Sequence, residues 1–210
     1  MKTLFVESIL RLELRLIKNF LKKYKIVKKK NIVACGDRVH LFLPTLDSAK
    51  DYLILTNKSI DFHQPWIFPA KTIKEYKFYL SRIRKGYTKG FFISRNSDNQ
   101  LLGVININDI RYGAYCSCTL GYYLDKDFCK KGYMLEGLVL LMNLAFDTLF
   151  FNRIEVNIQP GNISSKSLVK KCGFQLEGFS SKFLKLDSEW RDHERWAAVK
   201  DSWKSIQHLR

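Results

Sequence analysis

Residues 120–174 constrain the fold of this chain more than any other stretch. A strand-like run at 120–124 leads through a short basic turn into a long apolar segment at 133–150, and a second strand-like run follows at 153–158. A strand, a helix and a strand in this order predict a right-handed crossover that places the two strands side by side and parallel. The stretch therefore predicts an α/β domain.

The remaining elements add antiparallel strands and helices to this core. Pro44 ends one strand, Thr45 or Asp47 can cap the helix that follows it, and Gly86 ends a second helix. We predict strands at 39–43, 90–94, 101–108, 115–124, 153–158, 179–186 and 194–200, and helices from 45 or 47 to 59, at 72–84, at 133–150 and after Asn162. The sum is a mixed, mostly antiparallel sheet of six or seven strands flanked by helices.

Composition narrows the class of protein. The chain has 210 residues, of which 46% are hydrophobic, and this suits one large domain or one domain with an appendage. The longest apolar stretch, 138–151, is shorter than the roughly 18–20 residues that span a bilayer. The five cysteines and four histidines show neither metal-ligand spacing nor a secretory context, so we expect reduced thiols, no metal and a cytoplasmic protein.

The formal net charge of +16 is unevenly distributed. Residues 1–38 hold eleven Lys or Arg residues against three acidic ones, and residues 4–23 have the pattern of an amphipathic helix with a wide apolar face. Such a helix packs on the domain, on another subunit of a homodimer, or on a membrane surface, and we favour packing against protein. We predict a basic extension at 1–36 and the main folded domain at 37–210, with docking of residues 1–30 on a ribosome or another anionic surface.

A candidate phosphate site lies at the start of the long apolar helix. Lys130, Lys131 and Gly132 form a turn that opens directly onto this helix. The free N–H groups and the positive end of the helix dipole attract a phosphate or pyrophosphate.

Five short motifs occur in a fixed order around this turn. They read LGYYLD at 120–125, KGYMLEGL at 131–138, RIEVN at 153–157, PGNISS at 160–165, and GF at 173–174 with EG at 177–178. Together they resemble the GCN5-related N-acetyltransferases (GNAT). Pro65-Trp66 and the WRDH run at 190–193 are similar to the branch that acetylates the N-termini of ribosomal proteins, the RimJ/RimL type. The resemblance covers roughly residues 39–203.

This resemblance implies the GNAT fold and an acetyl-CoA-dependent N-acetyltransferase, in which the acceptor amine attacks directly in a ternary complex. It also implies that the strand before the loop splays from its neighbour and offers its backbone to the cofactor. The residues implied to bind acetyl-CoA are Gly121, Tyr122, Leu124, Cys129, Lys130, Lys131, Gly132, Tyr133, Met134, Asn162 and Ser165. The family loop usually reads Gln/Arg-x-x-Gly-x-Gly/Ala, and here Cys129 replaces its first residue, Lys130 a frequent glycine and Met134 its last residue.

Two side chains are implied to take part in catalysis. Ser165 matches the serine that the family uses to protonate the departing thiolate, and Asn157 takes the strand-end position where several members carry a glutamate. An amide cannot accept a proton at neutral pH, so Asn157 is expected to orient a water instead. Asn162 and Ser165 also fit a simple helix cap, and Glu155 is either a base or the ion-pair partner of Arg153.

The acceptor side carries Trp66, Trp190 and Asp192 as candidate substrate-binding residues. No candidate base is convincing, and an N-terminal amine, with a pKa of about 8, needs little help to lose its proton. We therefore expect the N-terminal α-amine of a protein as the acceptor. The alternatives are a small amine such as a polyamine or aminoglycoside, which a strongly basic chain receives poorly, and a weakly catalytic CoA-binding module docked on a ribosome or membrane.

Overall fold

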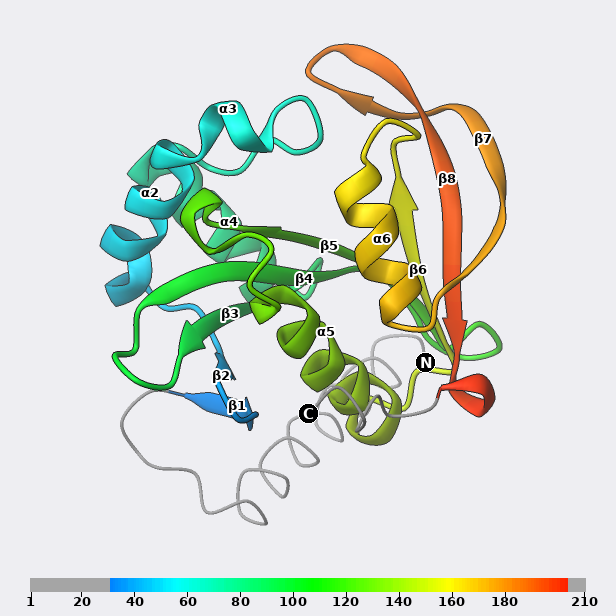
Figure 1. The fold of residues 1–210 in the computed structure, drawn as a ribbon, viewed down its shortest axis with the longest axis horizontal. Helices are drawn as coiled ribbons and strands as arrows, with labels where there is room; N and C mark the ends of the chain where they lie inside the picture. The colour runs from blue at the N-terminus through cyan, green and yellow to red at the C-terminus, as the bar shows by residue number, and fades with distance from the viewer. Residues whose placement is uncertain (1–30, 204–210) are drawn as a thin grey trace, which may run out of the picture.

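The computed structural model describes residues 31–203, so the predicted helix at 4–23 lies outside the described residues. An eight-stranded sheet runs through the molecule (Figure 1). Its strands, in spatial order, are β1 (Ile32–Cys35), β2 (Val39–Phe42), β3 (Lys89–Arg95), β4 (Leu101–Arg111), β5 (Ser117–Leu124), β6 (Arg153–Ile158), β8 (Glu189–Val199) and β7 (Gln175–Leu186). Only β5 and β6 pair in parallel, and the other neighbours are antiparallel.

Helices cover both faces of the sheet. They are α2 (Ala49–Lys58), α3 (Ile60–His63), α4 (Ile73–Arg84), α5 (Tyr133–Asn143) and α6 (Ile163–Lys171), with short 3-10 turns η1 (Leu46–Ser48), η2 (Lys126–Phe128) and η4 (Lys200–Ser202) and a π-helical turn η3 (Leu144–Thr148). No helix in the described part of the chain is long and apolar enough to span a bilayer.

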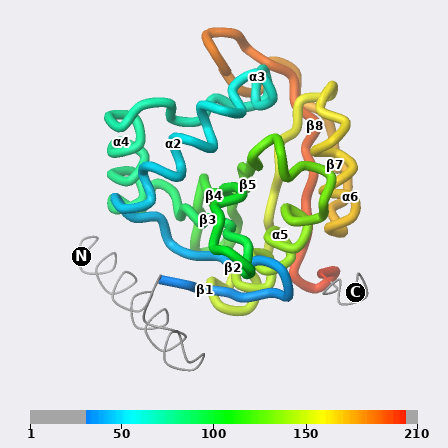
Figure 2. The backbone as a smooth tube through the Cα atoms, turned by 60° about the vertical axis from the view of Figure 1, so that its left-hand side comes forward, coloured from blue at the N-terminus to red at the C-terminus, as the bar shows by residue number. Residues whose placement is uncertain are grey.

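Alternation along the central strands explains the two layers of helices. Ile105 and Leu124 join the core cluster beneath α5 and α6, whereas Val104 and Tyr123, their neighbours in sequence, join the cluster beneath α2 and α4. Successive side chains of a strand point to opposite faces, so a strand buried on both sides is apolar throughout. Figure 2 shows α2 and α4 on one side of the sheet and α5 and α6 on the other.

The prediction of an α/β fold with a mixed, mostly antiparallel sheet is confirmed, but the strand number was too low. The extra strand is β1, which pairs with β2 from Ile32↔Phe42 to Cys35↔His40 and extends the edge of the sheet. It lies within residues 1–36, which the sequence analysis assigned to the extension. The helix predicted at 133–150 keeps α-helical geometry only to Asn143, after which the Leu149 N–H donates to the Leu144 carbonyl and widens the last turn.

Candidate functional site

The parallel strands β5 and β6 separate within the sheet. They pair only from Ser117↔Arg153 to Thr119↔Glu155. Beyond that point β5 stays paired with β4 as far as Gly103↔Leu124, and β6 stays paired with β8 as far as Ile158↔Glu194. The sheet therefore opens at the C-terminal ends of its two parallel strands, where α5 and α6 begin.

The opening leaves backbone groups of β5 without a strand partner. The Asp125 N–H donates to the Leu102 carbonyl of β4 at 2.7 Å. Because the hydrogen-bonding direction alternates along an antiparallel pair, the N–H and C=O groups of Tyr122 and Leu124 face away from β4, toward the opening. Gly121 faces the other way, toward Asn106 of β4.

Two hydroxyl groups meet across the opening. The Tyr122 hydroxyl oxygen of β5 lies 2.5 Å from Ser165 Oγ in the first turn of α6. Burial raises the pKa of Tyr122 above its ordinary value of 10, and the hydrogen bond with Ser165 offsets only part of this shift. Both hydroxyls therefore keep their protons at neutral pH. The sequence analysis placed both residues at the site but did not foresee this contact.

Asn162 fixes the position of Ser165. Its side-chain oxygen accepts a hydrogen bond from the Ser165 backbone N–H at 3.1 Å, which is the usual bond of a helix N-cap. The structure thus shows the capping role that the sequence suggested for Asn162. Since the cap uses the Ser165 backbone, the Ser165 hydroxyl stays directed to Tyr122.

Two residues of the loop between β5 and α5 have left-handed backbone conformations. Lys130 has φ +59° and Gly132, the residue before α5, has φ +81°. The first bond of α5 runs from the Glu136 N–H to the Gly132 carbonyl, so the N–H groups of the preceding residues have no partner within the helix. Gly132 adopts this conformation without strain, whereas Lys130 takes up a conformation in which glycine is more stable.

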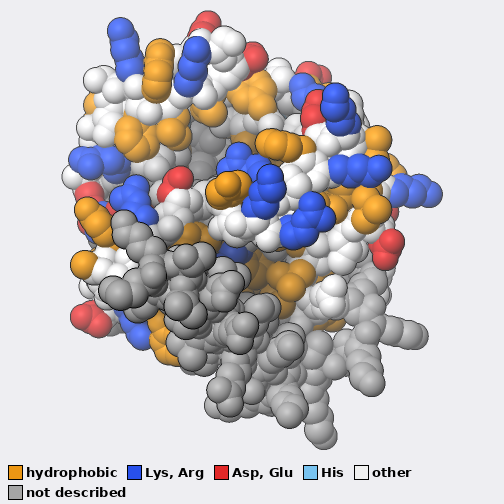
Figure 3. All heavy atoms as spheres, turned by 180° about the vertical axis from the view of Figure 1, so that it is seen from behind, with side chains coloured by type: hydrophobic (Ala, Val, Ile, Leu, Met, Phe, Trp, Pro, Cys, Tyr) orange, Lys and Arg blue, Asp and Glu red, His pale blue; other side chains and the backbone are white. Residues whose placement is uncertain are grey.

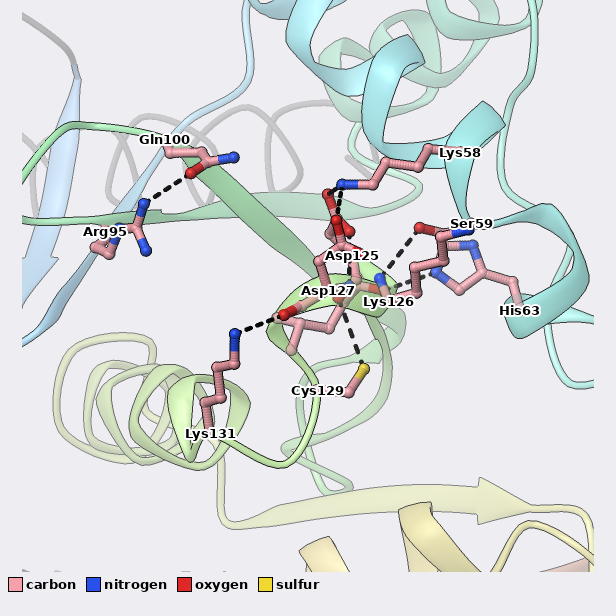
Figure 4. Close-up of polar contacts among 11 residues, drawn as sticks. Lys58, Ser59, His63, Arg95, Gln100, Asp125, Lys126, Asp127, Cys129 and Lys131 are labelled. Carbon is pink, nitrogen blue, oxygen red and sulfur yellow. Dashed lines mark hydrogen bonds and ion pairs between the residues drawn. The ribbon is translucent and has the colours of Figure 1, made fainter.

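Side chains from α2 and η2 support this loop (Figure 4). Lys58 forms ion pairs with Asp125 at 3.2 Å and Asp127 at 2.5 Å, and Lys131 Nζ donates to the Asp127 carbonyl at 2.8 Å. Cys129 donates through Sγ to the Asp125 carbonyl at 3.6 Å, and burial raises the pKa of its thiol. Cys129 is therefore a partly buried, protonated thiol that adds no charge to the loop.

Arg38, in the turn between β1 and β2, contacts the loop that precedes α5. Its Nη1 donates to the Lys131 carbonyl at 3.0 Å, and its Nε donates to Glu136 Oε2 at 2.9 Å. The other oxygen of Glu136 accepts the backbone N–H groups of Arg38 and Val39 at 2.8 and 3.2 Å. Glu136 thus has the structural role of tying β2 to α5. The sequence analysis missed Arg38, whose neighbours in sequence give no sign of this contact.

Glu155 and Asn157 are the two β6 residues considered for deprotonating the acceptor amine. Glu155 accepts a hydrogen bond from Arg153 Nε at 2.6 Å, and Arg153 also bonds Glu177. Glu155 is thus an ion-pair partner, which was one of the two roles expected of it. Asn157 lies at the end of β6 opposite Arg195, close to where the strands separate.

Trp66 reaches the far side of the opening. A Cβ atom placed on Gly161 would lie 3.1 Å from the Trp66 ring, so the indole packs directly against the turn that joins β6 to α6. Gln159 Nε2 donates to the Pro65 carbonyl at 3.3 Å and fixes the same loop. His63, buried just before it, contacts the Leu124 carbonyl through Nε2 at 2.9 Å, where we assign the N–H.

Trp190 and Asp192 lie on the β7–β8 hairpin. Trp190 pairs with Lys185 and is 58% exposed, and Asp192 accepts the Lys182 backbone N–H at 2.7 Å. Asp192 therefore stabilises the bulge of the hairpin. Figures 1 and 2 both show the hairpin turn arching toward the loop that follows α3, so the hairpin and the Trp66 loop approach the same end of the molecule.

The class of protein follows from a family comparison that covers the separated strands, the loop before α5 and the capped helix α6. The family model for an acetyltransferase (GNAT) domain matches residues 38–175. The chain belongs to the GNAT acetyltransferase family, and the prediction of an acetyltransferase domain is confirmed.

The chain is similar in sequence to known N-acetyltransferases, among them a ribosomal-protein acetyltransferase. It is 36% identical over 124 residues to the probable N-acetyltransferase YjcK of Bacillus subtilis (strain 168). The aligned stretch covers 59% of this chain and 67% of that protein. It is 31% identical over 106 residues to the ribosomal protein uS5-alanine N-acetyltransferase of Escherichia coli (strain K12). This alignment covers 50% of this chain and 55% of that enzyme. The matches thus span about half to two thirds of these relatives.

Solved structures share the fold. Mycobacterium smegmatis RimJ, in complex with a CoA-disulfide, superimposes with a TM-score of 0.74 at 22% identity and covers 81% of this chain and 86% of its own. RimL, a ribosomal α-N-protein acetyltransferase in complex with coenzyme A, gives a TM-score of 0.72 at 21% identity and covers 81% and 99%. At these identities the likeness establishes the GNAT fold.

Proposed function

We propose that the protein uses acetyl-CoA to acetylate the N-terminal α-amine of a protein, as the ribosomal-protein acetyltransferases do. The observation that carries this proposal is the contact between Tyr122 and Ser165 at the point where β5 and β6 separate. It places two protonated hydroxyls beside backbone groups of β5 that face away from β4, and within one turn of the α6 N-terminus. Acyl transfer needs both proton donors and fixed backbone dipoles.

The residues present fit acetyl-CoA. Gly132 has φ +81°, and a Cβ there would lie 3.0 Å from Arg38 Nη2, so glycine leaves this loop unstrained and uncrowded. The N–H groups at the start of α5, with Lys130 and Lys131, would hold the pyrophosphate. The backbone of Tyr122 and the N–H of Leu124 would hold the pantetheine amides, since His63 already bonds the Leu124 carbonyl. Bound acetyl-CoA supplies the acetyl group as a thioester.

The chain's own groups supply the proton chemistry. Ser165 Oγ can give its proton to the leaving group while the Tyr122 hydroxyl, 2.5 Å away, donates a hydrogen bond to the serine oxygen. The proton that the attacking amine releases to water then restores Ser165. The raised pKa of Tyr122 keeps that phenol protonated across the neutral range. Asn157 can orient a water that takes the proton of the attacking amine. Since Glu155 is engaged by Arg153, we assign it no part in deprotonation.

The similarity to a ribosomal protein uS5-alanine N-acetyltransferase supports a protein N-terminus as the acceptor. An α-amine has a pKa of about 8, so a measurable fraction is neutral without a strong base. In this view Trp66, Trp190 and Asp192 line the acceptor side, and the exposed indole of Trp190 suits a peptide more than a compact polycation.

The test is a calorimetric titration of the purified protein with acetyl-CoA, followed by thiol release with peptides that begin with Ala or Ser. The same peptides with a blocked N-terminus are the matched controls, and spermidine tests the small-amine alternative. Release that requires a free α-amine supports the proposal. Binding without release from any amine favours a docked CoA-binding module, and failure to bind acetyl-CoA contradicts both.

The same assay separates docking from chemistry if the basic extension is removed. The truncation should begin at Asn31 rather than after Gly36, because β1 pairs with β2 and forms the edge of the sheet. Turnover of a free peptide should survive this truncation if residues 1–30 serve docking on a ribosome or another anionic surface. Loss of turnover with retained folding would place residues 1–30 in the catalytic unit.

A further inference from the structure

A groove of about 520 Å³ lies far from the separated strands. It is formed by the end of α4, the turn before β3 and the end of β4, and it is lined by Phe78, Ser81, Arg82, Lys85, Gly86, Tyr87, Asp109 and Ile110. Because β4 runs antiparallel to β5, the end of β4 adjoins the start of β5, at the opposite end from Leu124. The groove is therefore separate from the acetyl-transfer site.

Two aromatic rings of the groove face solvent. Phe78 is 65% exposed and Tyr87 is 64% exposed. The inward side of α4 is formed by other residues, Tyr76, Tyr79 and Leu80, which pack against the sheet. Phe78 thus lies on the outward side of α4, where a large aromatic ring adds nothing to the core. Exposed aromatic rings in a groove are available to stack on a ligand.

The same region is strongly basic. Residues 71–89 contain seven Lys or Arg residues and a single acid, Glu75. Glu75 does not line the groove, and its Oε2 accepts the Lys71 backbone N–H at 2.7 Å. Within residues 31–203, neither Arg82 nor Lys85 takes part in an ion pair. Figure 3, which views the molecule from behind, shows Lys and Arg side chains interspersed with hydrophobic ones and few acidic ones around the middle of that face.

Asp109 is the one acid among the groove residues. Its Oδ2 accepts a hydrogen bond from Thr119 Oγ1 at 2.7 Å. Asp109 has φ +47° where the register between β4 and β5 shifts, and this irregular end of β4 lines the groove through Asp109 and Ile110. Together with the Ser81 hydroxyl, it offers a hydrogen-bond acceptor beside the aromatic and basic residues.

We infer that this groove binds single-stranded RNA. Arg82 and Lys85 contact phosphates, Phe78 and Tyr87 stack on bases, and the Asp109 carboxylate accepts from a ribose 2′-hydroxyl, a group that DNA lacks. An anionic membrane fits less well, because a bilayer surface is flat and meets only the rim of a groove. The inference does not depend on the proposed acetyl transfer.

The test uses the full chain and a fluorescent oligouridylate of about 12 nucleotides, within the size range of single-strand sites. Fluorescence anisotropy gives the affinity at a series of salt concentrations. Replacing both rings, Phe78→Ala with Tyr87→Ala, should weaken binding at least about 10-fold. Arg82→Gln with Lys85→Gln should lower the slope of log affinity against log salt by about 1.4, as expected for two phosphates of a single strand.

Matched controls separate this groove from the general positive charge of the chain. Lys50→Gln with Lys185→Gln removes the same charge from exposed positions on α2 and β7 and should leave the affinity within about 3-fold of wild type. All variants should bind acetyl-CoA like wild type. Equal binding by wild type and both groove variants would overturn the inference, as would equal affinity for duplex DNA. Binding to vesicles of anionic lipid that is lost in the groove variants, with no binding to oligouridylate, would assign the groove to a membrane instead.

Discussion

The Tyr122 hydroxyl oxygen lies 2.5 Å from Ser165 Oγ, across the gap in which β5 and β6 have lost their pairing. Tyr122 belongs to β5 and Ser165 to α6, so this contact connects the strand expected to bind the cofactor with the helix that follows the other parallel strand. Burial raises the pKa of Tyr122, so the pair is protonated when the reaction begins. Under the proposed function, Ser165 donates the proton and Tyr122 holds the serine oxygen through this hydrogen bond.

Removing the Ser165 hydroxyl should slow the chemical step. We expect Ser165→Ala to lower kcat about 100-fold, with little change in the Kd for acetyl-CoA, because general-acid catalysis contributes on this scale. Tyr122→Phe should change kcat in the same direction. The double variant should be no slower than Ser165→Ala, because residues that act as a unit are not additive. Steady-state kinetics with calorimetry measures both quantities.

The adjacent Ser164→Ala provides the control for this prediction. Ser164 is exposed and lies on the same helix turn, so its loss should leave kcat unchanged. A kcat of Ser165→Ala equal to that of wild type would remove Ser165 from the mechanism.

Glycine at position 132 should be required for cofactor binding. Gly132→Ala introduces a Cβ at φ +81° and 3.0 Å from Arg38 Nη2, so it should cost about 1–2 kcal/mol of stability and weaken acetyl-CoA binding by crowding the loop. Gly173→Ala, at φ +79° with no atom within 4 Å of the added Cβ, should lose similar stability while binding acetyl-CoA normally. Thermal unfolding and calorimetry distinguish the two effects. Equal affinities in both variants would mean that the phosphate lies elsewhere.

Arg38 should support the same loop through its geometry as well as its charge. Arg38→Lys keeps the charge but cannot contact the Lys131 carbonyl and Glu136 together, so it should weaken acetyl-CoA binding nearly as much as Arg38→Ala, by about 3- to 10-fold. The KM of the acceptor should not change. Full affinity in Arg38→Lys would show that only charge matters at this position. Glu136→Gln retains a side-chain oxygen that accepts the backbone N–H groups of Arg38 and Val39, so it should be less harmful than Arg38→Ala.

The buried His63 should make stability depend on pH. Burial lowers the pKa of His63 below its ordinary value of 6.5. Below pH 6.5 the unfolded chain binds a proton that the folded chain does not, so the free energy of unfolding falls as the pH drops toward the folded pKa. The loss is at most about 1.4 kcal/mol per pH unit.

His63→Gln should reduce this loss, because Gln can still donate to the Leu124 carbonyl but does not titrate. Denaturant unfolding at about pH 7.5 and about pH 5.5 measures the effect. Burial also lowers the pKa of His193, so His193→Gln should remove a separate part of the pH dependence. An unchanged pH dependence in His63→Gln would show that His63 has the same pKa in the folded and unfolded chain.

Local signals in the sequence predicted most of the fold. The strand predicted at 153–158 is β6 with the same bounds, because alternating apolar residues end at a Pro-Gly turn. The helix predicted at 72–84 is α4, and Thr72 is its N-cap, accepting the Glu75 N–H. Edge strand β1 was missed because a four-residue strand gains its stability from pairing with β2 rather than from a pattern of its own.

Contacts between distant residues were harder to predict. Arg38 and Glu136 are 98 positions apart, and Tyr122 and Ser165 are 43 apart. The motifs placed Tyr122 and Ser165 at one site, but the contact between their hydroxyls depends on the angle at which β5 leaves β6 and on the cap at Asn162. The groove beside Phe78 and Tyr87 needed the structure as well, because the sequence pattern does not say which aromatic residues of α4 face solvent.

The Trp66 indole should determine how well the acceptor binds. It packs on the Gly161 turn at the end of β6, beside the residues expected to move the protons. Trp66→Ala should therefore raise the KM of an N-terminal peptide about 10-fold or more and leave the Kd for acetyl-CoA unchanged, since a large aromatic contact is lost on the acceptor side alone. Trp66→Phe should recover part of the loss. Trp190→Ala, which removes a second exposed indole from the β7–β8 hairpin, should add to the effect only if the hairpin turn reaches the same peptide. A normal peptide KM in Trp66→Ala would place the acceptor on another side of the opening, and a weaker acetyl-CoA affinity would show that Trp66 supports the cofactor instead.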